Sequence, residues 1–422
     1  MTRRRIVADD AIGSSARPSI PDATRRRRIL LVEDWAHVRA GHFPIRFAEL
    51  AEGFVDAGCR VDVLTSRGWA LADSSGSVPF AVGQYGPYRR IASRFASLML
   101  ALGATPVATW PRRIGLTLRV IVMIGAARAQ RRRAVGDPPD VVVISWEVNP
   151  VLATVLAGPG RWILYQYSSP PVAMSALSRA LSALARRIEA HRRRVGGRVH
   201  IVVQTEEWAS AWASLAPFIA TEVIPLTGAR TCASIPGARA RLGLAPDERV
   251  ALMFGAVHPE KDCSVVWRAF TELPDWRLLI VGTVAGAYTA SLEHLRLGQR
   301  PIVIDGYVDN AWRDLAYAAA DVVVLSFRPN HYRDSGVLAD AIAWGVPVVC
   351  STSSASAECV AEYGLGVAFE SGDASSLVRA VSSIPRVRPE DVERARRALS
   401  NVAVARRWLH AMDSDLTARG RA

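Results

Sequence analysis

Short runs of β-branched and aliphatic residues recur along the chain, and amphipathic segments separate them. Runs of this length predict buried strands of a parallel sheet, and the segments between them predict helices. In the first half the predicted strands are ILLVE (29–33), RVDVLTS (60–66), DVVVIS (140–145), RWILYQYS (161–168), IVVQT (201–205) and EVIPL (222–226). In the second half they are RVALMFG (249–255), WRLLIVG (276–282), PIVIDGY (301–307), DVVVLS (321–326), PVVCS (347–351) and GVAFE (366–370), and the predicted helices there include 288–297. Two successive strand–helix series predict two doubly wound, Rossmann-like α/β domains.

The same pattern sets the expected domain limits. Residues 1–28 are rich in Arg, Ser, Pro and Asp without periodicity, which predicts a disordered basic tail. The first Rossmann-like domain is expected over 29–226 and the second over 227–385. The remaining residues, 386–422, are rich in Arg and are predicted to form a helical segment.

One segment of the second half has the pattern of an anion site. The predicted strand 321–325 leads through a polar loop to Asp334, a residue type that caps helices. The first turn of that helix would be Ser335, Gly336 and Val337, whose free N–H groups and helix dipole favour a negative charge. A diphosphate would suit this position. The alternative interpretation is an ordinary strand–helix unit with a well-capped helix.

Two segments, 88–134 and 172–194, combine apolar residues with many arginines. The second predicts an amphipathic helix with arginines on one face and an apolar stripe on the other, made of Leu177, Leu181, Leu184 and Ile188. Both segments fit packed helices with a solvated arginine face. They also fit helices that bind an anionic membrane surface.

Composition narrows the choice of partners. The net charge of +13 and the pI of 10.2 favour nucleic acid, an anionic membrane or a phosphorylated substrate. We expect no nucleic-acid partner, because the chain has neither zinc-finger spacing nor an aromatic-rich basic sheet motif. No apolar run follows Arg3–Arg5, no run is long enough to span a membrane, and no cysteines form a CxxC pair. These features predict a cytoplasmic protein, either free or peripheral on the inner face of the membrane. Lys261 is the only lysine, so its position is informative.

Several segments occur in an order that is typical of a known family: FGAVHPEKD (254–262), LLIVG (278–282), DGYVDNAWRDLAYAAADVVVLS (305–326), DSGVLADAIAWGVPVV (334–349) and AECVAEYGLGVAFESGD (357–373). Together they resemble the retaining glycosyltransferases of the GT-B fold, family 4 in particular. The loop that starts at Gly41 resembles the opening of the same family. The resemblance implies two domains facing each other across a cleft, with the C-terminal segment crossing back to the first domain.

The resemblance also implies roles for individual residues. Lys261 would meet the charge that develops on a departing diphosphate, and Gly255 would lie beside it. Tyr307 would contact the nucleotide base and Asp340 the ribose hydroxyls. The donor site would include the helix turn Ser335, Gly336 and Val337, and no metal ion or other cofactor is expected. Gly41 and His42 would face the diphosphate from the first domain, on the acceptor side.

Two positions depart from the family pattern. Ala256 follows Gly255 where the family has an arginine, and Tyr332 stands where its first glutamate falls. Asp334, two residues later, could replace that glutamate in catalysis or serve only as the helix cap. The leading hypothesis is therefore a retaining, metal-independent glycosyltransferase that uses a nucleotide-sugar donor and a glycan, lipid-linked or small-molecule acceptor. The alternative is a degenerate GT-B protein that binds a nucleotide, glycan or partner glycosyltransferase without turnover. A nucleotide-sugar epimerase fits less well, because no set of acid and base residues accompanies the motifs.

Overall fold

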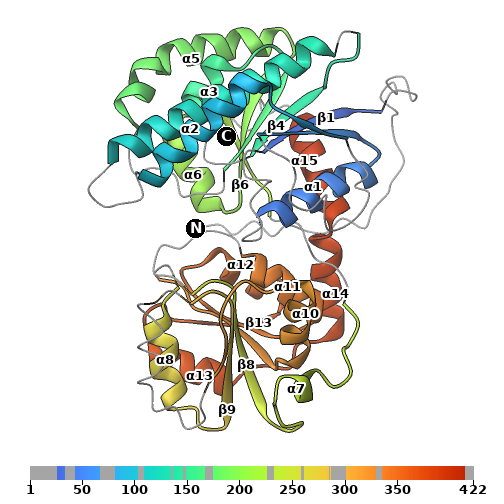
Figure 1. The fold of residues 1–422 in the computed structure, drawn as a ribbon, viewed down its shortest axis with the longest axis vertical. Helices are drawn as coiled ribbons and strands as arrows, with labels where there is room; N and C mark the ends of the chain where they lie inside the picture. The colour runs from blue at the N-terminus through green and yellow to red at the C-terminus, as the bar shows by residue number, and fades with distance from the viewer. Residues whose placement is uncertain are drawn as a thin grey trace, which may run out of the picture.

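The structure is a computed structural model with two α/β units, one above the other in Figure 1. It describes residues 26–33, 43–66, 81–102, 109–134, 136–145, 149–166, 174–225, 232–257, 261–284, 286, 301–328 and 335–413. The predicted helix 288–297 lies outside these residues. None of the described helices combines the length and hydropathy that a transmembrane segment requires.

The N-terminal unit is built on a seven-stranded sheet in the order β3-β2-β1-β4-β5-β6-β7, with every neighbouring pair parallel. Its strands are β1 (Arg28–Glu33), β2 (Arg60–Thr65), β3 (Ala81–Gln84), β4 (Val141–Ser145), β5 (Arg161–Tyr165), β6 (Arg198–Val203) and β7 (Ala220–Val223). The central strands are buried on both faces, which explains their nearly continuous apolar runs.

Helices cover both faces of this sheet. They are α1 (Phe43–Asp56), α2 (Pro87–Leu102), α3 (Thr109–Arg133), α4 (Pro150–Leu156), α5 (Ala176–Arg194) and α6 (Glu206–Leu215). One core lies between the sheet and α1 together with the C-terminal helix α15 (Asn401–Asp413). The other core lies between the sheet and α3, α4 and α6, with α2 packed on α3 and α5 packed on α4.

The C-terminal unit repeats the arrangement with a six-stranded parallel sheet in the order β10-β9-β8-β11-β12-β13. Its strands are β8 (Arg249–Phe254), β9 (Trp276–Val281), β10 (Ile302–Ile304), β11 (Val322–Leu325), β12 (Val348–Ser351) and β13 (Gly366–Phe369). Its helices are α7 (Ala238–Arg241), α8 (Cys263–Thr271), α10 (Asn310–Ala319), α11 (Gly336–Trp344), α12 (Ala355–Tyr363), α13 (Ala374–Ser382) and α14 (Pro389–Ala398). The prediction of two doubly wound domains is confirmed.

The last two helices contact different units. α14 contributes to the core beneath α11 and α12, whereas α15 packs on α1. Trp408 of α15 makes edge-to-face contacts with Phe54 at 6.2 Å and with Tyr165 at 4.9 Å between ring centroids. Asp413 closes this contact with ion pairs to Arg27 and Arg161. The chain therefore returns to the first sheet at its end (Figure 1).

One local prediction needs correction. The N-cap of α11 is Ser335, not Asp334, because the Ser335 hydroxyl accepts the Val337 N–H at 3.2 Å and the helix begins at Gly336. The apolar stripe predicted on α5 is partly open to solvent, because Leu177 and Leu184 are 43% and 47% exposed.

Candidate functional site

The site is built at the carboxyl edge of the second sheet, where β8 and β11 lie side by side. Gly255 directly follows β8 with a φ of +84°, a conformation that favours glycine. The chain returns to the edge at Lys261, which forms an isolated bridge with Phe327 beyond β11. Hydrogen bonds between Asp262 and Ser326 fix this return, one at 3.1 Å from the Asp262 N–H and one at 3.1 Å from the Ser326 hydroxyl. Strand order reverses at this point, and open α/β sheets bind ligands at such switch points.

Lys261 is held there by its surroundings. Lys261 is only 8% exposed, and its Nζ donates a hydrogen bond of 2.6 Å to the Phe254 carbonyl oxygen. Among the described residues no carboxylate forms an ion pair with it. Burial lowers the pKa of Lys261 to about 8, and the nearby Cys263 partly opposes the shift. The side chain is therefore an ammonium at neutral pH without a carboxylate partner in the described part of the chain, which suits it to an anionic ligand.

The start of α11 lies beside the same lysine. A Cβ built on Gly255 would be 3.4 Å from Lys261 Nζ and 3.8 Å from a methyl carbon of Val337. The structure therefore brings together Gly255, Lys261 and Val337. Their role in donor binding stays a prediction. Ser335 and Gly336 form the N-terminus of this nine-residue helix, and both are buried. The positive end of the helix dipole and the ammonium can act on one anion.

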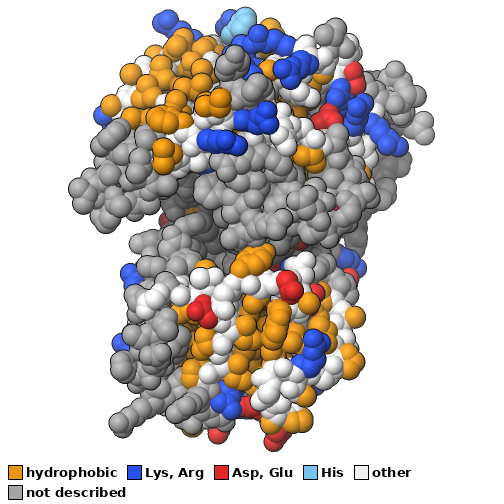
Figure 2. All heavy atoms as spheres, in the orientation of Figure 1, with side chains coloured by type: hydrophobic (Ala, Val, Ile, Leu, Met, Phe, Trp, Pro, Cys, Tyr) orange, Lys and Arg blue, Asp and Glu red, His pale blue; other side chains and the backbone are white. Residues whose placement is uncertain are grey.

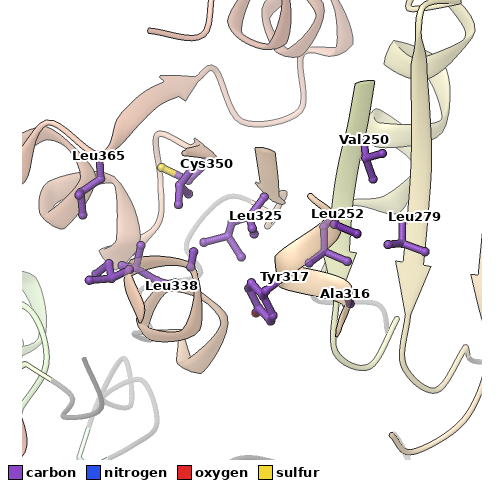
Figure 3. Packing of buried hydrophobic residues seen from close by; sticks show 14 of the residues in the cluster. Val250, Leu252, Leu279, Ala316, Tyr317, Leu325, Leu338, Cys350 and Leu365 are labelled. Atoms are coloured by element: carbon purple, nitrogen blue, oxygen red, sulfur yellow. The ribbon is translucent and has the colours of Figure 1, made fainter. Parts of the chain in front are cut away.

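The packing beneath the site fixes this geometry. The Tyr317 hydroxyl of α10 donates to the Val337 carbonyl at 3.3 Å, and the Tyr317 ring packs against Phe254 at 5.2 Å. Figure 3 shows Tyr317 and Leu338 in the buried cluster that joins α10 and α11 to the sheet strands. Buried apolar packing therefore positions the N-terminus of α11.

Two more residues of the predicted donor site, Asp340 and Tyr307, belong to other parts of the second unit. Asp340 is 7% exposed and sits four residues after Gly336, on the same side of α11. Tyr307 is 65% exposed, in the segment between β10 and α10 and two strands away from β8. Asp334, Gly41 and His42 lie outside the described residues, so their assigned roles stay predictions.

Sequence reasoning missed one supporting residue. Ser351, at the end of β12, is fully buried, and its hydroxyl accepts the Phe327 N–H at 2.9 Å and donates to the Leu325 carbonyl at 3.4 Å. It thereby holds the segment that faces Lys261. A serine-rich stretch directly after a predicted strand was the available signal.

The carboxyl edges of the two sheets face each other. Burial raises the pKa of Glu358, in the first turn of α12, and the negative charges of Glu206 and Glu207 raise it further. Glu206 and Glu207 open α6, directly after β6 of the first sheet. Helices that begin at the two carboxyl edges are therefore close neighbours. The described residues contain no group of three or more His, Cys, Asp or Glu placed to hold a metal ion.

Comparison with known proteins agrees with this picture. Residues 248–385 match the model of the family described as glycosyl transferases group 1, and this range holds every described residue of the candidate site. A D-inositol 3-phosphate glycosyltransferase of Mycolicibacterium gilvum is 32% identical over 200 residues, covering 44% of this chain and 42% of the relative. One from Mycobacterium bovis is 34% identical over 148 residues, covering 33% and 28%. The chain thus spans less than half the length of these curated relatives.

Solved structures extend the likeness to both units. Sucrose-phosphate synthase from Thermosynechococcus elongatus superposes with a TM-score of 0.64 at 18% identity, over 92% of this chain and 98% of that one. Anabaena Alr3699/HepE, solved with UDP and glucose, gives a TM-score of 0.58 at 15% identity, over 92% and 99%. The fold is GT-B, as the sequence predicted.

Proposed function

We propose that this protein is a glycosyltransferase that moves a sugar from a nucleoside diphosphate sugar to an acceptor bound on the side of the first unit. The observation that carries the proposal is the Lys261 ammonium, buried beside Gly255 and the N-terminus of α11. The match of this half to glycosyl transferases group 1 supports the same assignment.

The reaction breaks the bond between the anomeric carbon and a diphosphate oxygen and forms one from that carbon to a hydroxyl oxygen of the acceptor, which loses its proton. Negative charge develops on the leaving diphosphate oxygen. Lys261 and the free N–H groups at the start of α11 meet that charge where it appears. In this proposal they do so without a metal ion, and the anomeric configuration is retained. Tyr307 contacts the base, Asp340 holds the ribose hydroxyls, and Asp334 assists catalysis.

The acceptor is a glycan, a lipid-linked sugar or a small molecule. The enzyme is cytoplasmic, either free or peripheral on the inner face of the membrane. The names of the curated relatives indicate that they glycosylate D-inositol 3-phosphate. A phosphorylated acceptor also suits a chain with a net charge of +13. Gly41 and His42 would contact it.

One observation favours a second candidate, a GT-B protein that binds nucleotide without turnover. Ala256, which is exposed directly after Gly255, replaces the arginine that the family pattern has there. Lys261 is then the remaining cation of that pair, and a site with half of its positive charge could bind a donor without activating it.

A thermal-shift screen of nucleoside diphosphates and their sugars, followed by a hydrolysis assay, tests both candidates. A ligand at about 100 times its dissociation constant adds roughly 2.7 kcal/mol to the free energy of unfolding, which raises the melting temperature measurably. The enzyme proposal expects binding together with slow release of nucleoside diphosphate from one donor. Binding without any release would support the second candidate, and no binding by any member of the panel would refute both.

A further inference from the structure

Three helices of the first unit expose apolar side chains in regular stripes. On α2 the exposed residues are Ile91, Phe95 and Leu98, spaced as one helix face, and Ile91 is 65% and Phe95 50% exposed. On α3 and α5 the exposed residues are seven apart, again on one face of each helix: Ile114 and Ile121, and Leu177 and Leu184.

These stripes lie on one side of the molecule. α2 packs on α3, α5 packs on α4, and all four helices cover the sheet face opposite α1 and α15. Figure 2 shows hydrophobic side chains gathered over this part of the N-terminal unit, with Lys or Arg side chains beside them. Single exposed apolar residues are ordinary, but seven on three helices of one layer make a surface that water solvates poorly.

The charges on the same helices are almost all positive. α2 and α3 contain no Asp or Glu in a chain that has 39 of them. α5 contains only Glu189, which is buried and paired with Arg192 and Arg193. The exposed cations are Arg90, Arg94, Arg128, Arg132, Arg133, Arg179, Arg186, Arg187, Arg193 and Arg194.

We propose that the outer surface of α2, α3 and α5 docks on an anionic lipid bilayer. The arginines contact the headgroups, and the tips of Ile91, Phe95 and Leu98 enter the interface between headgroups and acyl chains. The combination of exposed apolar tips with an unbroken positive charge fits a lipid surface better than nucleic acid, which offers phosphates but no apolar layer for three stripes.

Sedimentation of the full chain with vesicles tests the proposal. Vesicles of phosphatidylcholine and phosphatidylglycerol should pull the protein down at low salt, and high salt should weaken binding. Arg94 of α2 and Arg132 of α3 are exposed on the same helix faces as the apolar stripes. Arg94→Gln with Arg132→Gln should lower affinity roughly 30-fold, since each arginine near an anionic surface contributes about fivefold. The matched control is Arg406→Gln with Arg407→Gln, two adjacent exposed arginines on α15, and it should stay within about twofold of the parent.

A second pair of variants tests insertion. Ile91→Ser with Phe95→Ser should lower affinity more than about tenfold, because both apolar tips leave the interface. Val303→Ser, 41% exposed on β10, is the control and should leave affinity unchanged. No sedimentation at low salt would overturn the proposal, as would equal losses in test and control variants. So would self-association through this face, or binding of an RNA or DNA duplex, without vesicle binding.

Discussion

The depressed pKa of Lys261 makes the affinity for a nucleoside diphosphate depend on pH. The pKa of the free protein's lysine is about 8, lowered by burial from 10.5. A diphosphate favours the ammonium, so it binds the protonated form and affinity falls as pH rises through 8. About nine tenths of the side chain is protonated at pH 7 and about one tenth at pH 9. The expected loss between these values is therefore roughly tenfold, about 1.4 kcal/mol.

Calorimetric titration with UDP at pH 7 and pH 9 measures this loss. Lys261→Arg is the matched control, because a guanidinium stays charged over this range. Its affinity at pH 7 should be weaker than the parent's, since a planar fork does not replace a compact ammonium, but it should change less than about twofold by pH 9. A tenfold fall in both proteins would assign the titration to another group and refute the role given to Lys261.

Three further predictions concern the start of α11 and two positions in the first unit. Gly336→Val should abolish UDP binding while the melting curve stays cooperative, because a side chain there intrudes on the anion; unchanged affinity would place the site elsewhere. Gly53→Ala should cost about 1–3 kcal/mol in urea unfolding, since its Cβ would clash with the Asn401 carbonyl oxygen, whereas Gly86→Ala, with open space around it, should be neutral. Burial lowers the pKa of His200 from 6.5 to about 4. As pH falls from 6.5 towards 4, the unfolded chain therefore binds a proton that the folded protein does not, and up to about 3 kcal/mol of folding stability is lost. His200→Leu should remove that part of the acid sensitivity, and an unchanged loss between pH 7 and 4.5 would contradict the assignment.

The sequence predicted the strands because parallel strands covered on both faces need long apolar runs. Val141–Ser145 and Val322–Leu325 are such runs, and both form central strands of their sheets. Once β8 is recognised, the segment after it must lie at the carboxyl edge. That reasoning places Lys261 at the edge where the structure has it.

What the sequence could not predict depends on contacts distant in the chain. β3 (Ala81–Gln84) lies at the edge of its sheet and has only four residues. These residues do not form the long apolar run that predicts a central strand. Ser335 and Asp334 are both good capping residues, and only backbone geometry decides between adjacent positions. The period of the α5 stripe shows that Leu177 and Leu184 share a face, but not whether another element covers that face.

The most direct test of the central claim is the rate of donor hydrolysis or transfer by Lys261→Ala. The donor is the one found in the thermal-shift screen, and circular dichroism confirms that the variant is folded. If the ammonium stabilises the departing diphosphate, its removal should lower the rate by about 10²- to 10³-fold, or about 2.7–4 kcal/mol of transition-state stabilisation. A variant that keeps more than about a third of the parent's rate would show that Lys261 does not meet the developing charge and that the active site lies elsewhere.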